Sequence, residues 1–294
     1  MNDFNELPSP PTLTVGGCAT LACIWEATAA KPGNVYRGAD FEDLSYVDFL
    51  TSAAVVGPIL DDAASRGVGA TVRAGVEATR AAVVTNTNLG MMLLLAPLAA
   101  VSDEAPLIEG IRPLLGGLTV EDAENVYAAI RAAQPGGLGT VEHGDVNAPE
   151  PPRMTLLEAM ALAADRDLVA RQYVDDFADV FWTADGVQAA VAADRPLGEA
   201  IVRGYLELLA RRPDTLIARK CGGAVAEEAS RRAAAVLQSL EAGEDAYRGA
   251  LADFDFWLRA DGHRRNPGTS ADLIAAALFI LLRERRLDWP IRFY

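Results

Sequence analysis

A short N-terminal segment brings hydrogen-bond donors and carboxylates together around a helix-breaking turn. Its sequence is AAKPGNVYRGADFEDL, in which proline and glycine force the backbone to turn. Its donors are Lys31, Asn34 and Arg37, and its carboxylates are Asp40, Glu42 and Asp43. Such donors bind phosphate, and Mg²⁺ held by carboxylate oxygens commonly bridges substrate phosphates. The segment therefore predicts a phosphorylated ligand with Mg²⁺; the alternative is an acidic surface loop in which Asp40 or Asp43 only caps the next helix.

The chain has only two lysines, although it uses arginine two dozen times. The compact ammonium of lysine holds a phosphate as a point charge, so Lys31 and Lys220 are candidates for that role. Lys220 lies in DTLIARKCGG, where Arg219 and Lys220 precede Gly222 and Gly223 and indicate a phosphate cradle of cations and backbone amides. The alternatives are chance in an arginine-rich chain and a helix C-terminus that ends at glycine.

A third segment, TNTNLGMMLLLAPL, places polar side chains directly before an apolar helix. One of them serves as the N-cap, which leaves Asn86 or Asn88 to present its amide to an anion at the positive end of the helix. The fourth segment is DGHRRNPGTSADL, where Thr269 and Asp272 have the spacing of a capping box. His263 in that segment and His143 are candidates for proton transfer, although a lone histidine in a polar loop is commonly just solvated.

Composition limits the remaining possibilities. The formal charge of the 294-residue chain is −15, which argues against broad binding of nucleic acids. The longest apolar run, MMLLLAPLAAV, is too short for a membrane span, and the first residues do not resemble a signal peptide. Three cysteines without metal-ligand spacing and only two histidines favour buried thiols in a reducing cytoplasm over a metal centre built on those residues.

Alanine-rich stretches with apolar residues three and four apart predict an all-α protein, a single domain over residues 1–294 with about ten helices or more. We expect residues 1–12 to be a flexible N-terminal segment and the Pro- and Gly-rich stretch 135–153 to be a long loop that serves as a lid. The expected capping boxes are Ser45 with Asp48, Thr119 with Asp122, Thr155 with Glu158, and Thr269 with Asp272. Further expected helices cover residues 13–29, 68–82, 89–102, 166–182, 196–210, 222–241 and 243–260.

Taken in order, AAKPGNVYRGADFEDL, TNTNLGMMLLLAPL, PGGLG, AMALAADRDLVARQY, DTLIARKCGG and NPGTSADLIAAALF resemble the successive motifs of the CitG family, the triphosphoribosyl-dephospho-CoA synthases. The resemblance runs from about Glu26 to Leu282. It implies an all-helical enzyme that joins ATP to 3'-dephospho-CoA, giving 2'-(5''-triphosphoribosyl)-3'-dephospho-CoA and adenine. Members that serve citrate lyase typically read KPGLVD and then GAHxDM, whereas this chain has no histidine after Gly38 and is similar to a second branch, seen in archaea and some bacteria.

The resemblance implies roles for the residues of these motifs. Lys31, Arg37, Arg219 and Lys220 would hold the triphosphate, with Asn34 and Gly222 beside them. Asn86 and Asn88 would orient ribose or phosphate, and Glu42, Asp43 and Asp272 would hold Mg²⁺. Asp40 or Glu26 would take the proton of the attacking hydroxyl.

Two alternatives stay open at this point. One is a related ATP-using transferase or ligase-like enzyme of another cofactor pathway, for example that of a C1-carrier cofactor, with a different acceptor; the changed first motif favours it. The other is a non-catalytic nucleotide-binding protein or a helical interaction protein. An apolar helical protein of this size is also expected to form a homodimer.

Overall fold

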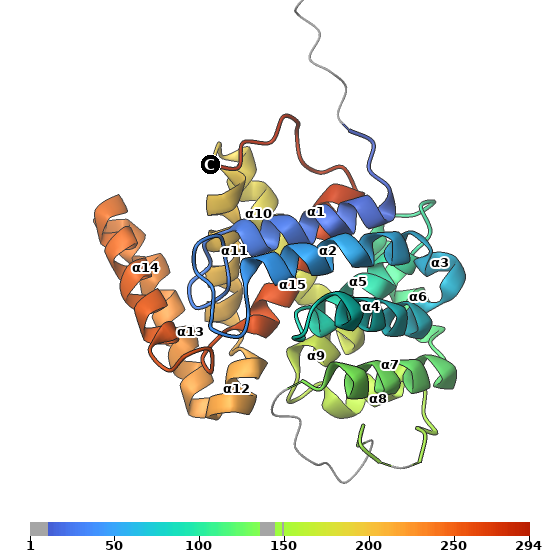
Figure 1. Cartoon of the computed structure of the whole chain (residues 1–294). Coiled ribbons are helices and arrows are strands. Elements are labelled where there is room, and N and C mark those ends of the chain that lie inside the picture. The colour runs from blue at the N-terminus through green and yellow to red at the C-terminus, as the bar shows by residue number, and fades with distance from the viewer. Residues whose placement is uncertain (1–10, 136–144, 149) are drawn as a thin grey trace, which may run out of the picture.

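The computed structural model describes residues 11–135, 145–148 and 150–294 (Figure 1). These residues form fifteen α-helices and one short 3-10 helix, and they contain no β-strand, only two isolated bridges, Tyr36 with Ala39 and Phe41 with Leu44. The all-α prediction is confirmed. The helices are α1 (Val15–Thr28), α2 (Tyr46–Asp61), α3 (Ala63–Arg66), α4 (Val68–Ala82), α5 (Leu89–Ala100), α6 (Leu107–Gly116), α7 (Val120–Ala133), α8 (Leu156–Ala163), α9 (Leu168–Val174), α10 (Ala178–Ala192), α11 (Leu197–Arg211), α12 (Thr215–Cys221), α13 (Gly223–Gln238), η1 (Ser239–Ala242), α14 (Glu244–Arg259) and α15 (Gly268–Arg283).

The centre of the molecule is α15, which is hydrophobic around its whole circumference. Every residue from Leu273 to Leu282 is buried, and the helix packs against α1, α5, α10 and α11 (Figure 1). A helix that is apolar on all sides must be surrounded by others. The same holds for α5, where ten of twelve residues are buried. No helix within the described ranges has the length and apolarity that a membrane crossing requires.

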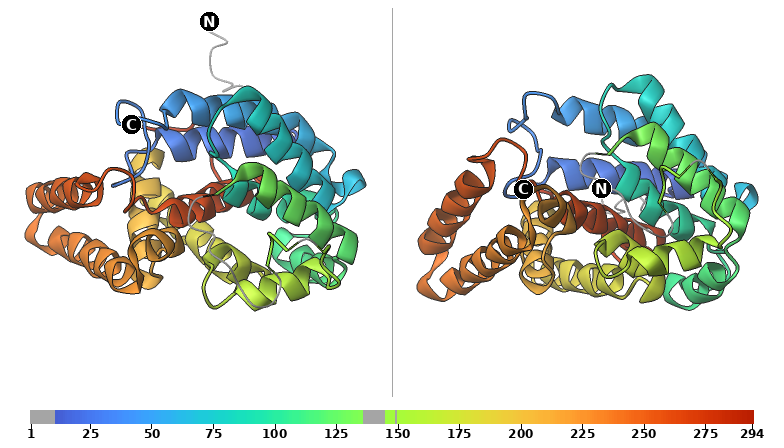
Figure 2. Two further views of the ribbon diagram at one scale, coloured as in Figure 1. Left: turned by 60° about the horizontal axis from the view of Figure 1, so that its bottom comes forward. Right: turned by 90° about the horizontal axis from the view of Figure 1, so that it is seen from below.

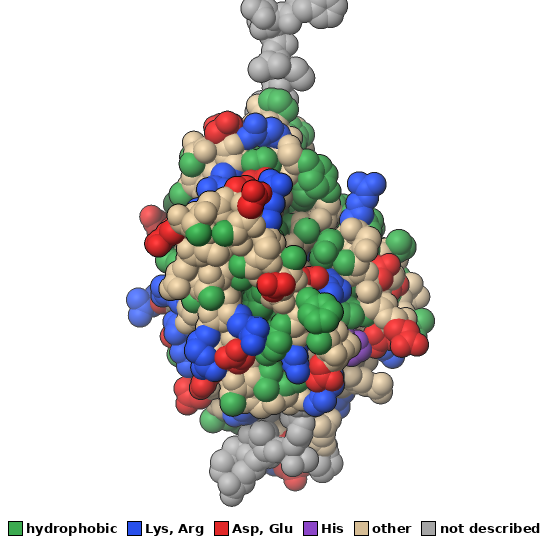
Figure 3. Space-filling model, turned by 90° about the vertical axis from the view of Figure 1, so that its left-hand side faces the viewer, with side chains coloured by type: hydrophobic (Ala, Val, Ile, Leu, Met, Phe, Trp, Pro, Cys, Tyr) green, Lys and Arg blue, Asp and Glu red, His purple; other side chains and the backbone are tan. Residues whose placement is uncertain are grey.

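Helices α13 and α14 form a hairpin at one edge of the molecule (Figures 1 and 2). The hairpin is anchored by α13, which packs against α11 and α12. On the face that carries this hairpin, acidic and basic side chains alternate with single hydrophobic ones, and no broad basic area appears (Figure 3). That pattern agrees with the charge argument against nucleic-acid binding.

Three of the four expected capping boxes are present. In each, the side chain of Ser45, Thr119 or Thr155 accepts a hydrogen bond from the third helical residue, whose carboxylate accepts one in return. The fourth prediction is wrong, because α15 begins at Gly268, directly after Pro267. Thr269 therefore lies inside the first turn, where its hydroxyl accepts a hydrogen bond from Thr215 at 3.2 Å. The carboxylate of Asp272 is consequently not used at the helix end.

Helix bounds were predictable where a clear breaker follows the apolar pattern. The expected helix over 68–82 coincides with α4, whereas the single helix expected over 166–182 is two helices. Asp176 and Phe177 interrupt it with left-handed φ values of 50° and 61°. Phe177 is wholly buried, and this packing outweighs the strain of its backbone. Two helices, α3 and α6, were not expected, and α12 corresponds to the alternative of a helix that ends at glycine.

The predicted flexible segment over residues 1–12 and the predicted lid over 135–153 lie largely outside the described residues. His143 also lies outside them.

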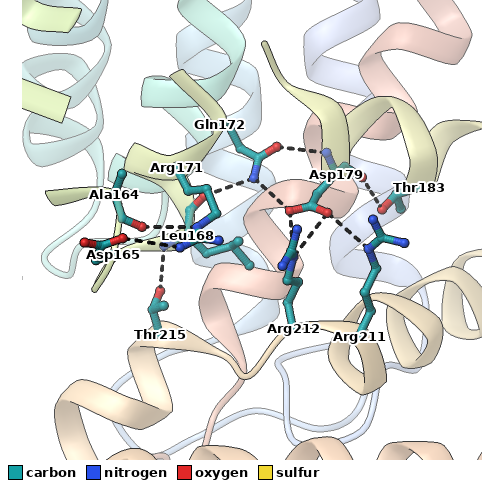
Figure 4. Close-up of polar contacts among 10 residues, drawn as sticks. All are labelled: Ala164, Asp165, Leu168, Arg171, Gln172, Asp179, Thr183, Arg211, Arg212 and Thr215. Atoms are coloured by element: carbon teal, nitrogen blue, oxygen red, sulfur yellow. Dashed lines mark hydrogen bonds and ion pairs between the residues drawn. The ribbon is translucent and has the colours of Figure 1, made fainter. Parts of the chain in front are cut away.

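A buried carboxylate joins α10 to the C-terminus of α11 (Figure 4). Asp179 is 1% exposed and accepts hydrogen bonds from the guanidinium groups of Arg211 at 3.3 Å and Arg212 at 3.1 Å. Gln172 closes the cluster, because its amide oxygen accepts from the Asp179 backbone N–H. Nearby, Arg171 meets the fully exposed carboxylate of Asp165 at 3.7 Å.

We expect Asp179→Ala to lower the free energy of unfolding by about 2 kcal/mol, since it leaves two arginines and an amide without their acceptor. Urea unfolding followed by circular dichroism measures the change. Asp165→Ala is the matched control: its pair with Arg171 is exposed, so we expect a change within about 0.5 kcal/mol. Equal losses in the two variants would show that burial of the Asp179 cluster contributes nothing.

Candidate active site

A cleft with a volume of about 910 Å³ opens where the four predicted segments meet. The turn segment before α2 forms one wall, and α12 and the first turns of α15 form another. The N-termini of α5 and α9 and the C-terminus of α7 complete it. The positive ends of α5 and α15 border the cleft, which favours anions there. Of the predicted site residues, those that line the cleft are Asn34, Glu42, Asp43, Asn86, Asn88, Arg219, Lys220 and Asp272, and the candidate His263 lines it as well.

One buried carboxylate fixes α12 to α15. Asp214 is fully buried, and its Oδ1 accepts hydrogen bonds from the backbone N–H groups of Leu216 at 2.9 Å and Ile217 at 3.1 Å. Its Oδ2 accepts from the N–H of Ser270 at 2.7 Å and from the hydroxyl of the same residue at 2.8 Å. Asp214 thus caps α12 and holds the first turn of α15 at once, which sets the helix of Lys220 against the helix of Asp272.

The cations of α12 face the cleft from its last turn. Arg219 pairs with Asp167 at 3.0 Å, and Asp167 in turn caps α9 through hydrogen bonds from Val169 and Ala170. Lys220 is half-buried and makes no ion pair within the described ranges. Burial and the neighbouring Arg219 lower the pKa of Lys220. Gly222 ends the helix at φ 90°, so this segment has the geometry of a helix C-terminus and still presents two cations to the cleft.

The turn segment is held in place by α14 and by the loop before α15. The N–H of Gly33 donates to Asp255 at 2.7 Å, and at φ 71° a Cβ on Gly33 would lie 2.6 Å from Leu258. Only glycine suits this position. The amide of Asn34 donates to Asn266 at 2.9 Å, which joins the first and fourth segments at the cleft.

The N-terminus of α5 uses its two asparagines differently. The side chain of Asn86 accepts the hydrogen bond of the Leu89 N–H at 3.1 Å and acts as the cap. Asn88 is 5% exposed, and its amide donates to Thr79 at 2.8 Å. Both line the cleft, and the carbonyl oxygen of Asn88 makes no side-chain capping bond.

The surroundings of Asp272 strongly raise the pKa of its carboxylate. It lies on the cleft wall and has no hydrogen-bond or ion-pair partner among the residues that the structure describes. Burial raises the pKa of Asp272 well above its ordinary value, the nearby carboxylates of Glu26, Asp214 and Asp167 raise it further, and Arg219 opposes them. A carboxylate held this way binds a cation or a proton readily.

Gly90 makes room for this carboxylate at the start of α5. A Cβ on Gly90 would lie 2.0 Å from Oδ2 of Asp272. We therefore expect Gly90→Ala to displace Asp272, to lower the free energy of unfolding by about 1–3 kcal/mol and to reduce activity. Thermal unfolding and the adenine-release assay described below measure both effects.

Gly116→Ala is the control for Gly90→Ala, because a Cβ at Gly116 would meet nothing within 4 Å. Gly116 ends α6 away from the cleft, so we expect unchanged activity and unchanged or slightly higher stability. Full activity in Gly90→Ala would show that the position of Asp272 is not critical.

Lys31 does not reach the cleft. Its side chain is fully buried, its ammonium meets Glu26 Oε1 at 2.9 Å, and it donates to the backbone oxygens of Glu26 and Ala29. Burial raises the pKa of Glu26 and lowers that of Lys31, while each partner's charge opposes the shift of the other. The expected convergence of Lys31 and Lys220 on one cleft is thus not seen, because the turn folds Lys31 back onto the end of α1.

Four other predicted residues have different surroundings. Asp40 is exposed, and its carboxylate accepts from the Tyr46 N–H at 2.6 Å. Asp43 pairs with His263 at 2.9 Å, and the ring of His263 lies edge-on to Phe41. Arg37 and Gly222 are exposed and, like Asp40, Glu26 and Lys31, are not among the residues that line the cleft. The ligand roles expected of these residues stay predictions.

The predicted metal ligands do not form a preformed centre. Across the described ranges, no group of three His, Cys, Asp or Glu side chains is spaced to hold a metal ion. Mg²⁺, however, is usually bound by one or two carboxylates together with substrate phosphates and water. Asp272 and Glu42 supply oxygen ligands of that kind on the wall of the cleft, so the donor set fits Mg²⁺ that arrives with a nucleotide.

Comparison with known proteins decides which reaction this geometry serves. Residues 12–291 match the family model of CitG, ATP:dephospho-CoA triphosphoribosyl transferase. The chain belongs to the CitG family. Its fold is similar to a crystal structure described as a candidate triphosphoribosyl-dephospho-CoA synthase from Archaeoglobus fulgidus, with a TM-score of 0.60, 26% identity, and coverage of 80% of this chain and 98% of that one. No curated protein matches the chain.

The cleft of this CitG family transferase has further residues that the sequence did not single out. They are Arg80 in the last turn of α4, Asp167 at the start of α9, and Asn266. Asp167 precedes LVARQY with the spacing of an N-cap, and this signal could have found it. Asn266 is the first residue of the motif NPGTSADLIAAALF, which could have pointed to it, whereas Arg80 carries no local signal, because only the tertiary fold brings it to the cleft.

Proposed function

We propose that this cleft transfers the triphosphoribosyl group of ATP to the ribose of 3'-dephospho-CoA. The C1'–N9 bond to adenine breaks, a bond from the acceptor 2'-hydroxyl oxygen to C1' forms, and the hydroxyl proton passes, in net terms, to the departing adenine. The observation that carries the proposal is the arrangement of the walls. Arg219 and Lys220 lie on α12, and Asp272, whose carboxylate has no partner among the described residues, lies on α15; Asp214 fixes these two helices together.

In this proposal the cations and helix ends hold the triphosphate. Arg219 and Lys220 neutralise its charge, and the N-termini of α5 and α15 add backbone dipoles. Asn86 and Asn88 then orient the ribose from the start of α5. Glu42, Asp43 and Asp272 would hold Mg²⁺, which would supply charge neutralisation at the phosphates when bound.

The proton of the attacking hydroxyl needs an acceptor in the cleft. Glu26 is buried against Lys31 and Asp40 faces solvent, and neither lines the cleft. Asp272 lines the cleft, so its carboxylate is better placed to accept this proton, and burial raises its pKa. The proposed reaction requires the carboxylate of Asp272, either as a ligand of the cation or as the acceptor of the proton.

The test is release of free adenine. The protein is incubated with ATP and Mg²⁺, with and without 3'-dephospho-CoA, and adenine is separated by chromatography. We expect adenine only when the acceptor is present, together with an acceptor heavier by one triphosphoribosyl group in mass spectrometry. Lys220→Ala should weaken ATP binding and slow the release, whereas Arg248→Ala, on the exposed face of α14, should not. No adenine with any acceptor would contradict glycosyl transfer.

A second acceptor class is favoured by one observation. The first motif has no histidine after Gly38, and we propose that the chain belongs to the branch that shares this feature. In that case the same nucleotide-binding residues would serve an enzyme of another cofactor pathway, such as that of a C1-carrier cofactor. Adenine release with an acceptor other than dephospho-CoA would identify it, while ATP binding without any release would indicate a nucleotide-binding protein.

Two further predictions concern the whole protein. We propose a cytoplasmic location, which the three free cysteines fit. We also propose a homodimer, and light scattering of the purified protein measures its mass in solution directly.

A further inference from the structure

A second, smaller cavity adjoins the cleft. Its volume is about 250 Å³, and it lies between α7, α8 and α9. Arg219 and Asp167 line both cavities, so their ion pair stands at the junction. We call this cavity the annex. A ligand that lies along the cleft past Arg219 can therefore reach into the annex.

The chemistry of the annex differs from that of the cleft. Its walls are mostly buried hydrophobic side chains, among them Val126, Leu156 and Met160, together with the half-buried Ala159. The polar residues that line the annex are Tyr127, Asp145, Asn147 and Arg166, together with Asp167 and Arg219 at the junction. The cleft, by contrast, is lined by several cations, carboxylates and amides. The two cavities together suit a ligand with one anionic and one apolar end.

Size narrows the choice of occupant. Pockets for drug-sized ligands have volumes of about 300–1,000 Å³, so the annex holds a single ring system and not a whole nucleotide. Among the proposed substrates, ATP supplies a triphosphate for Arg219 and Lys220 and a planar base for the annex, whereas 3'-dephospho-CoA carries the same base with only a diphosphate. The pantetheine arm of the acceptor fits less well, since its two amide groups would be buried against aliphatic walls at considerable cost.

We propose that the annex binds the adenine base of the triphosphate donor. This rests on the proposed function, because it assigns a place to the base that the reaction releases. The adenine ring lies between α7 and α8, the ribose passes the Asp167–Arg219 pair, and the triphosphate lies toward Lys220. The departing base is then held in an apolar site away from solvent.

Methionine methyl groups report on the two cavities separately in the unmodified protein. Met160 lines the annex and Met91 lines the cleft. In protein labelled with ¹³C at the methionine methyls and assigned with Met160→Leu and Met91→Leu, we expect ATP with Mg²⁺ to shift the Met160 signal through the ring current of adenine. Inorganic tripolyphosphate should bind competitively and leave Met160 unshifted.

The outcomes separate this proposal from the proposed function. If ATP shifts Met91 and not Met160, or if dephospho-CoA and not ATP shifts Met160, the annex proposal is overturned and the reaction stands. If ATP shifts Met160 but no adenine is ever released, the annex proposal stands and the reaction fails. If ATP does not bind, both fail.

A pair of substitutions on α8 gives a second measurement. Ala159 lines the annex, whereas Ala161 is exposed and lines neither cavity. We expect Ala159→Phe to raise the Kd for ATP by about 10-fold or more through the lost space, with the Kd for tripolyphosphate unchanged. Ala161→Phe should leave both constants unchanged. An unchanged ATP affinity in folded Ala159→Phe would overturn the proposal, and the methyl shifts decide the matter if that variant does not fold.

Discussion

Replacing Lys31 by alanine is expected to lower the free energy of unfolding by about 3–5 kcal/mol, because it leaves the buried carboxylate of Glu26 without its counter-ion. Oε2 of Glu26 already accepts no hydrogen bond within the described residues. Since burial raises the pKa of Glu26, the folded variant takes up a proton there that the unfolded chain releases above about pH 4.3. The loss is therefore smallest in acid and grows as the pH rises toward neutrality.

The control for Lys31→Ala is the double variant Glu26→Gln with Lys31→Met. It removes both charges and keeps the volume, so we expect it to recover most of the stability. Urea unfolding between pH 4 and pH 8 measures both proteins. The double variant also tests the role that the resemblance implies for Lys31: wild-type ATP affinity would show a structural lysine, and lost affinity in the folded protein would show a phosphate ligand. A loss below about 1 kcal/mol in Lys31→Ala would contradict the buried pair.

Asp272→Asn is expected to have opposite effects on activity and on stability. Activity should fall by about 100-fold or more, since the proposed reaction needs this carboxylate for the cation or for the proton. In buffer that contains a metal chelator, so that no cation binds Asp272, the variant should be more stable than the wild type at pH 7. The pKa of Asp272 is raised in the folded state, so the stability of the wild type falls as the pH rises above the unfolded value of about 3.9. Asparagine removes this fall.

The measurement for Asp272→Asn is a series of urea unfolding curves from pH 3.5 to pH 8, with adenine release followed in parallel. We expect the two proteins to differ little in stability at pH 3.5 and the difference to grow as the pH rises to 7. Asp165→Asn, at an exposed position, tests whether the loss of any carboxylate has the same effect. A difference in stability that does not change with pH would contradict the burial of this charge.

Much of the fold follows from local signals. Capping boxes at Ser45, Thr119 and Thr155 fixed the starts of α2, α7 and α8, and apolar periodicity followed by a breaker fixed α4. The signals failed where tertiary packing overrides them. The pattern from Leu168 continues through Phe177, yet the chain turns there because that ring is buried in the core, and α6 forms although it contains glycine and proline.

The candidate site was less predictable, for a physical reason. The sequence shows which side chains can bind phosphate but not which way each one faces. Arg219 and Lys220 reach the cleft from the last turn of α12, whereas Lys31 has equally suggestive neighbours and is buried against Glu26. Asp272 was expected to use one carboxylate oxygen in a capping box. Because α15 begins earlier, at Gly268, the carboxylate takes no part in a cap and lies on the wall of the cleft. Asp167 pairs with Arg219, which is 52 residues away in the sequence, so this contact in the site could not be predicted from its neighbours.

The four hydrogen bonds of Asp214 also couple the unfolding of α12 to that of α15. Helix α12 has seven residues, too few to be stable alone, and its first amides share one carboxylate with the first turn of the most buried helix. We therefore expect the amide protons of Leu216, Ile217 and Ser270 to exchange with solvent as one cooperative unit, with similar protection. Native-state hydrogen exchange would then show that the wall that carries Lys220 unfolds as slowly as the core.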